Sequence, residues 1–194
     1  NFNQAAEGAG RFAAMTRGLV EQPVMAFAGF ETAMSRVAAL THEVGTDAFG
    51  RMQAQAEELG AATSFSATEA ATAMGNYAQA GMNANQVMAL TPPTMALARA
   101  AAAGLDQTSS ILGNTLNTLG IDAAQAGMAA DVLAATFSSS NTTLASLGAS
   151  FEVVAPLAQE TGTDIQTLAA MVAVLGNNGI QASEAGTGLR TVMR

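Results

Sequence analysis

The sequence predicts an all-α protein built from amphipathic helices in repeated helical hairpins. Hydrophobic residues recur at the three- and four-residue spacings of a helix, as in Ile165, Leu168, Val172 and Leu175. The 194 residues contain only 4 prolines, 49% hydrophobic residues and 5% aromatic residues, a composition that suits closely packed helices. No run of β-branched residues alternates with polar ones between turn signals, so strands have little support.

The stretch from Thr163 to Arg194 shows one such hairpin most clearly. Thr163 can cap the start of a helix, and Gln166 stands three positions later, where its side chain can reach back to the cap. Gly179 followed by Ile180 fits a left-handed helix end in which an apolar residue folds back. We expect Ser183 to cap the second helix of this hairpin.

The glycine pattern of this stretch recurs earlier, at Gly81 and Gly120. Each of the three glycines is followed by an apolar residue, then Asn, Asp or Gln, then Ala. The spacing is uneven, 39 and then 59 residues, which predicts degenerate hairpins rather than a regular solenoid. The predicted structural turns are therefore at Gly81, Gly120, Gly179 and Ile180. The predicted helix caps are Ser66 with Glu69, Asp106, Asp122, Thr163 and Ser183.

The chain divides into two parts by composition. Residues 1–22 mix Ala with several glycines and predict a linker or the end of an upstream helical region. Residues 23–194 predict a helical core region, a fragment of a longer chain. Within it we expect a long amphipathic helix from Pro23 to Gly60 with an apolar seam between Phe27 and Val44, and a helix that starts at Thr91 and Pro92.

Charge and cysteine content exclude several kinds of site. The formal net charge is −8, and the absence of lysine leaves no basic stripe that could bind nucleic acid by counterion release. There are no cysteines, so the chain has neither disulfides nor thiolate metal sites. No window supplies about 20 continuous apolar residues for a membrane span. Because charged residues make up only 11%, we expect the apolar surface to be covered by oligomerisation or enclosure.

Individual residues suggest no catalytic chemistry. His42 is the only histidine, and its acidic neighbours Glu43 and Asp47 make neither a metal set nor a triad with a serine. Glu57 and Glu58 are adjacent and point to different sides of a helix, unlike a glycosidase pair. Gly186 and Gly188 lack the lysine of a phosphate loop and suit close helix packing. We therefore expect no enzymatic activity, no cofactor and no metal.

From about Phe30 to Met193, the chain resembles the core region of phage tail tape measure proteins, also found in prophage and gene-transfer-agent tails. The similarity is most specific near the end of the sequence, in Asn178-Gly179-Ile180, Ser183, Ala185-Gly186-Thr187 and Leu189-Arg190. Earlier matches include Phe30-Glu31, Met34, Val37, Leu59-Gly60, Thr63, Ser66, Glu69-Ala70, Ala80-Gly81, Asp131 and Leu133-Ala134. The Pro92-Pro93 pair and the absence of lysine depart from the family pattern.

The resemblance implies a structural virion protein inside the tail tube or tail tip, which sets tail length during assembly and leaves ahead of the DNA. It also implies contacts with tail tube proteins, tail-tip or baseplate hub proteins and tail assembly chaperones, and transient contact with the host membrane. No specific nucleic acid binding is expected.

We further expect a homo-oligomer around an axis, with a trimer favoured, because alanine-rich seams bury little surface in a monomer. The alternative function is that of a membrane-active helical pore-forming protein, which would also be rich in Ala and Gly and weakly amphipathic.

Overall fold

The computed structural model describes residues 27–180 and 182–192, and every regular element in these ranges is helical. The all-α prediction is therefore confirmed for this part of the chain. A first helix over residues 27–41 is followed by α2 Asp47–Ala62, α3 Ala67–Gln79, α4 Ala84–Ala101, α5 Leu105–Leu119, a short 3-10 helix η1 Ala123–Gln125, α6 Ala126–Ser139, α7 Leu144–Thr161, α8 Ile165–Asn177 and α9 Ala182–Val192.

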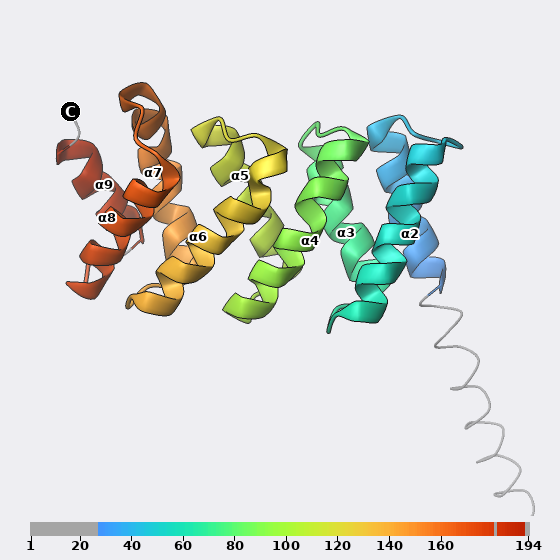
Figure 1. Ribbon diagram of the computed structural model, residues 1–194, viewed down its shortest axis with the longest axis horizontal. Coiled ribbons are helices and arrows are strands. Elements are labelled where there is room, and N and C mark those ends of the chain that lie inside the picture. Colours follow the sequence, from blue (N-terminus) through green and yellow to red (C-terminus); the bar gives the residue numbers. More distant parts are fainter. Residues whose placement is uncertain (1–26, 181, 193–194) are drawn as a thin grey trace, which may run out of the picture.

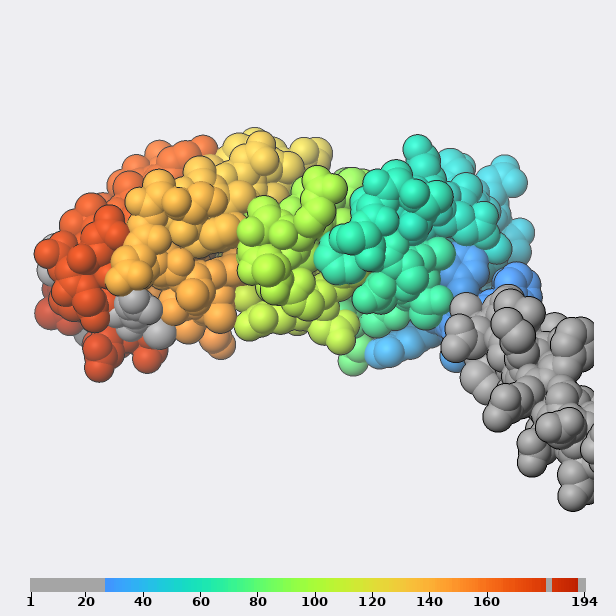
Figure 2. All heavy atoms as spheres, turned by 90° about the horizontal axis from the view of Figure 1, so that it is seen from below, coloured from blue at the N-terminus to red at the C-terminus, as the bar shows by residue number. Residues whose placement is uncertain are grey.

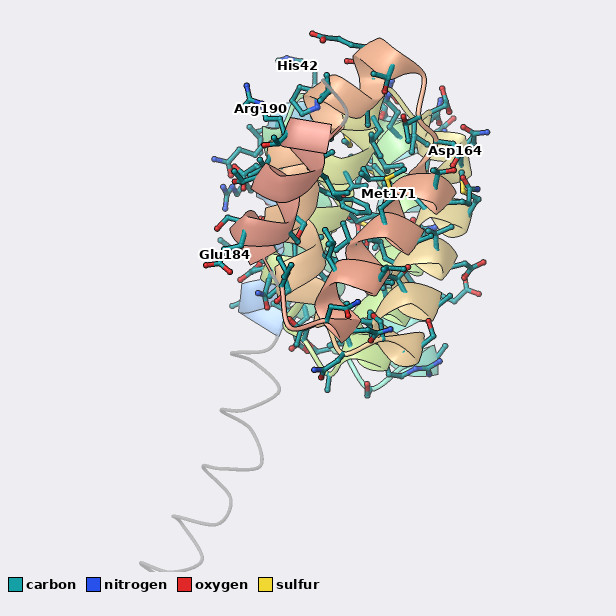
Figure 3. The ribbon with its side chains drawn as sticks, turned by 90° about the vertical axis from the view of Figure 1, so that its left-hand side faces the viewer. His42, Asp164, Met171, Glu184 and Arg190 are labelled. Carbon is teal, nitrogen blue, oxygen red and sulfur yellow. The ribbon has the colours of Figure 1, made fainter. Side chains whose placement is uncertain are left out.

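The helices stand side by side in two layers, and consecutive helices run in opposite directions (Figure 1). One layer contains α3, α5, α7 and α9, and the other contains α2, α4, α6 and α8, since each helix packs on the helix two positions along. Figure 3, viewed from the C-terminal end, separates the two layers at α8 and α9. Figure 2 shows an elongated body in which the sequence advances steadily from one end to the other.

The array has a regular repeat. The helices α3, α5, α7 and α9 begin at residues 67, 105, 144 and 182, so successive pairs are 38, 39 and 38 residues apart. The interpretation that excluded a regular solenoid is therefore wrong. Each pair contacts its neighbours along the array, as in repeat proteins generally.

The equivalent turns of this repeat are at Gly81, Gly120 and Gly162, which follow α3, α5 and α7. Their φ angles are 85°, 67° and 69°, in the left-handed region that glycine adopts without strain. Two positions after each glycine an Asn or Asp caps the next helix: Asn83, Asp122 and Asp164. The repeated signal is thus a left-handed glycine followed two residues later by a capping side chain.

Gly179 lies in a different kind of turn, the turn that follows a helix of the α4/α6/α8 layer. It has φ 83° and follows α8, and the Ile180 amide donates to the Leu175 carbonyl at 2.9 Å to close that helix. The alignment of Gly179 with Gly81 and Gly120 was therefore wrong in register. The 59 residues from Gly120 to Gly179 correspond to about one and a half repeats, because Gly120 follows α5 and Gly179 follows α8, three helices later. The glycine one repeat after Gly120 is Gly162, which ends α7.

Three of the residues predicted to cap helices, Asp106, Thr163 and Ser183, do not occupy the cap position in the structure. Helix α5 begins at Leu105 with Gly104 as its cap, because Leu105 is drawn into the core, and Asp106 falls within the first turn. The Thr163 amide closes α7 by donating to the Ala158 carbonyl at 2.8 Å, which leaves Asp164 to cap α8. Ser183 lies inside α9, which begins at Ala182.

The predicted long helix from Pro23 to Gly60 is divided in the structure. His42 and Gly45 both have positive φ, 61° and 74°, and Thr46 caps α2 by accepting from the Phe49 amide. The prediction of one long helix with a continuous apolar seam was therefore wrong. Its outer members Phe27 and Val44 are 66% and 73% exposed, and Gly60 lies inside α2. Pro23 and residues 1–22 lie outside the described residues.

Helix α4 passes through Pro92 and Pro93, so the predicted start at Thr91 was also wrong. A proline removes one helical hydrogen bond, and Pro92 leaves the Met88 carbonyl without its usual donor. Gln55 of α2 supplies the replacement, since its Nε2 donates to that carbonyl at 3.1 Å. The helix therefore continues where sequence rules would end it.

The core lies between the two layers. It is made mainly of Ala, Leu, Val and Met, with few aromatic side chains. The largest side chains that are almost completely buried are Tyr77, Phe151, Met34, Met52, Met74, Leu90, Met95, Leu97, Leu112, Leu133, Leu147 and Leu168. Such small side chains let the layers approach closely, so packing depends on where the glycines lie.

Candidate functional site

Within the described residues, no three His, Asp or Glu side chains are grouped so that they could hold a metal ion. His42 lies in the turn between the first helix and α2, near the top of the view along the array in Figure 3. Glu57 and Glu58 are exposed on α2. None of the described helices is both long and apolar enough to cross a bilayer.

Glycines lie at close contacts between successive helices of one layer. A Cβ on Gly113 of α5 would lie 3.2 Å from Tyr77 Cε1 of α3, and one on Gly148 of α7 would lie 2.9 Å from Ile111 Cγ1 of α5. A Cβ on Gly186 of α9 would lie 2.8 Å from the Ser150 carbonyl oxygen of α7. The contact at Gly186 is the least adjustable because it meets backbone. The close-packing role expected for Gly186 agrees with this geometry. The same expectation for Gly188 was wrong, because no atom lies within 4 Å of where its Cβ would be.

Tyr77 connects the two layers. Its side chain is 2% exposed, and its hydroxyl shares a hydrogen bond with Thr94 Oγ1 of α4. Thr94 Oγ1 also lies 2.6 Å from the Leu90 carbonyl, so the phenol belongs to a short buried chain of polar groups. Burial raises the pKa of the Tyr77 phenol far above its ordinary range, and the hydrogen bond with Thr94 lowers it only partly. The group therefore stays protonated and acts in packing.

The two faces of the array differ in chemistry. On the α3/α5/α7 face, grooves of about 350 and 520 Å³ flank α5 and are lined largely by amides and hydroxyls, including Asn76, Ser110 and Asn114. On the α4/α6/α8 face, grooves of about 460 and 360 Å³ are lined mainly by small side chains. Charged residues are few in all four grooves, so none resembles a phosphate site.

The caps and turns proposed as site residues hold helix ends. Ser66 and Glu69 form a capping box at the start of α3, in which Glu69 Oε2 accepts from the Ser66 amide at 2.8 Å. Asp122 Oδ1 accepts from the Ala124 amide at 2.8 Å. Asp164 Oδ1 accepts from the Thr167 amide at 2.6 Å, and this bond is the main cause that lowers the pKa of Asp164. These residues lie at separate turns and do not converge on one point.

Comparison with known proteins adds the decisive observation. The family model of phage-related minor tail proteins matches residues 53–194, which include α3 to α9 completely and most of α2. The chain belongs to the phage-related minor tail protein family. It is also 35% identical over 179 residues to the tape measure protein of Pneumococcus phage Dp-1. That match covers 88% of this chain and 16% of the relative's length.

Family membership confirms the resemblance to phage tail tape measure proteins and makes the chain a structural protein of the virion tail. No solved structure matches the chain. The alternative of a pore-forming protein is not favoured by these relatives.

Sequence reasoning missed two residues that matter for the fold. Asn83 caps α4, and Gln55 satisfies the Met88 carbonyl. Gly162, which the sequence indicated as the end of its segment, ends α7. Asn83 could have been found, because Gln86 follows it at the spacing of a capping box.

Proposed function

We propose that the chain is part of a tape measure protein that lies in the lumen of the tail tube or tip, contributes to tail length during assembly, and leaves the tail ahead of the DNA. The observation that carries this proposal is the 35% identity over 88% of the chain to a protein of that name. The chain spans only a small part of that relative, 16% of its length, so the role of the whole protein is inferred here from a segment.

The physical properties of the chain support a place in a channel that DNA later uses. The net charge of −8 and the absence of lysine give a surface that repels phosphates, so DNA would pass without being held. The grooves of both faces carry few charges and offer hydrogen-bonding or small apolar side chains to a neighbour.

The array itself is too compact to be the measuring rod. A continuous helix advances about 1.5 Å per residue. A pair of stacked helices advances the array by about 10 Å for some 39 residues, given the usual interaxial distance. We therefore propose that this segment is a folded body of the tape measure protein, placed near the tail tip, while more extended regions set most of the length.

We also propose that copies of the protein assemble as a homo-oligomer around the tail axis, with a trimer favoured, and contact tail tube, tail-tip or baseplate hub proteins and tail assembly chaperones. Transient contact with the host membrane would follow release. The grooved faces of the array offer surfaces for such contacts.

The test uses intact phage particles of the parent virus and an antibody raised against residues 27–192. In intact tails the antibody should not bind, and external protease should leave the segment uncut. After DNA release is triggered, the segment should appear in the supernatant or become cleavable. Antibody binding along the outside of intact tails would overturn a luminal position, and retention after ejection would overturn release.

A further inference from the structure

Within the α4/α6/α8 layer, each helix packs on the next, and the groove between two successive helices is lined by the same positions in both pairs. We call the four lining positions on the earlier helix its docking edge and the four opposite them on the later helix its receiving face. The docking edge of α4 is Pro93, Ala96, Leu97 and Ala100, which faces Gly127, Ala130, Asp131 and Ala134 of α6. The docking edge of α6 is Val132, Ala135, Thr136 and Ser139, which faces Gln166, Ala169, Ala170 and Ala173 of α8.

The two sets are in register along the sequence. Every position of the α6 docking edge is 39 residues after its counterpart in α4, and every position of the α8 receiving face is 39 residues after its counterpart in α6. Burial follows the same register, since the third position of the docking edge is 1% exposed in α4 (Leu97) and 7% exposed in α6 (Thr136). The repeat thus extends to single side chains.

The same step of 39 residues defines a docking edge on α8, formed by Met171, Val174, Leu175 and Asn178. No described helix lies on this edge in the place that α8 takes on α6. Figure 3 shows Met171 at this open end of the array. Leu175 is only half-buried, whereas its counterparts Leu97 and Thr136 are buried. Val174 is 60% exposed and does not separate the three edges, because its counterparts Ala96 and Ala135 are exposed too.

We propose that the docking edge of α8 binds one further amphipathic helix of the same tail polypeptide, packed as α8 packs on α6. The occupant is a helix because the two equivalent edges each hold a helix. We expect its facing positions to carry Ala or Gly at the spacing of Ala169, Ala170 and Ala173, the small residues that α8 presents to the groove it shares with α6.

The edge also carries larger apolar side chains than the α6 edge does. Met171, Val174 and Leu175 replace the smaller Val132, Ala135 and Thr136 of the α6 edge, so covering them removes more apolar surface from water. The phage Dp-1 relative, of which the matched segment is 16%, shows that such polypeptides contain ample further chain to supply the helix.

The test measures the reactivity of single cysteines toward a small maleimide, which is clean because the 194 residues contain no cysteine. Leu175→Cys reports on the docking edge, because its counterparts Leu97 and Thr136 are buried where a helix covers the edge. Ala170→Cys, at an exposed alanine of the same helix, is the matched control. Each variant is labelled in the chain of 194 residues and in the whole tail polypeptide, with any cysteines elsewhere replaced.

We expect the Leu175→Cys labelling rate to fall at least tenfold in the whole polypeptide, while the rate for Ala170→Cys changes by no more than about twofold. Equal Leu175→Cys rates in the two proteins would overturn the proposal. Protection that is already present in the 194-residue chain and increases with its concentration would show a second copy on the edge, and would overturn the assignment to the same polypeptide.

Discussion

The Gln55 side chain donates a hydrogen bond from Nε2 to the Met88 carbonyl at 3.1 Å, and so takes the place of the amide proton that Pro92 lacks. This contact joins α2 to α4 across 33 residues of sequence. It replaces the helical hydrogen bond that is lost at Pro92, and it leads to a prediction that separates the contact from simple loss of packing.

Replacing Gln55 with Leu should destabilise the chain by about 1 kcal/mol or somewhat more, because it leaves the partly buried Met88 carbonyl unsatisfied. In a Pro92→Ala background, the substituted residue supplies the missing amide, so the same Gln55→Leu change should cost much less. Urea unfolding of the four proteins gives the coupling energy directly. Equal costs of Gln55→Leu in both backgrounds would mean that the carbonyl is not what Gln55 stabilises.

The cost of replacing Gly179 should depend on backbone conformation alone and not on the space around the new side chain. Its φ of 83° strains other residues, yet no atom lies within 4 Å of where a Cβ would be. Gly179→Val should therefore cost about 1 to 3 kcal/mol, Gly179→Ala less, and Gly179→Asn least. In the virus, tails with Gly179→Val should assemble poorly by electron microscopy and infectivity titre.

Two controls accompany the Gly179 series. Gly127 is also free of neighbours but has no positive φ, so Gly127→Ala should be neutral or slightly stabilising. Gln181→Ala should leave assembly unchanged. If Gly179→Val gave full-length, infectious tails, the turn between α8 and α9 would be dispensable for assembly.

Gly186 should be intolerant for the opposite reason, namely lack of space. Even Gly186→Ala places a methyl group 2.8 Å from both the Ser150 carbonyl oxygen and Val153 Cβ, so α9 must shift away from α7. Overpacking of this kind costs about 1 to 3 kcal/mol. Gly188→Ala, two residues later with open space around it, should be neutral or stabilising. Calorimetry of both variants decides the matter, and equal melting temperatures would refute tight α7–α9 packing.

Asp164 predicts a specific pH dependence at the start of α8. Its hydrogen bond from the Thr167 amide lowers its pKa in the folded state below its ordinary value of 3.8. A carboxyl with a depressed folded pKa stabilises the fold above its ordinary pKa and loses that contribution as the pH falls through the folded value. Asp164→Asn keeps a capping oxygen without a titrating proton, so its stability should vary less with pH below about 4.

The Asp164 comparison is made by thermal unfolding of the parent chain and the variant between pH 2 and pH 6. The difference in melting temperature between the two proteins should change across the acid range and be constant above it. Parallel curves over the whole range would contradict the assigned role of the Asp164 carboxylate. Asp164→Ala, which removes the cap altogether, should be less stable than Asp164→Asn at every pH.

Insertion of one repeat tests whether the array stays folded in the tail. A second copy of residues 84–122 is one repeat long, and inserted after residue 122 it should add only about 10 Å to the tail if the pair stacks. The same residues in a continuous helix would add about 59 Å. Tail lengths measured by cryo-electron microscopy distinguish these values. Lengthening near the larger value would show that the segment is extended during assembly.

The sequence was sufficient for the helical class and for many helix ends, because these depend on local chemistry. Ser66 with Glu69 and Gly120 with Asp122 are contiguous signals that act within one turn of helix. Asp106 shows the limit of such signals, since burial of Leu105 moved the helix start two residues earlier than a side-chain cap alone suggests.

Register along the array was harder to predict because two kinds of turn share one signal. Gly162 and Gly179 both end helices in the left-handed region, and only the three-dimensional stacking shows that Gly162 is the partner of Gly81 and Gly120. The passage of α4 through Pro92 depends on Gln55, 37 residues earlier in the chain. No local rule contains that contact.

The neighbour-only packing of the array has a mechanical consequence. Helix α9 is held by α7 and α8, and the next pair inward is held in the same way, so tension applied at the C-terminal end would be opposed by one pair at a time. The segment could then be drawn out as a narrow string in steps of some 39 residues while the remainder stayed folded. A body of this kind yields progressively under load, as passage through a confined channel requires.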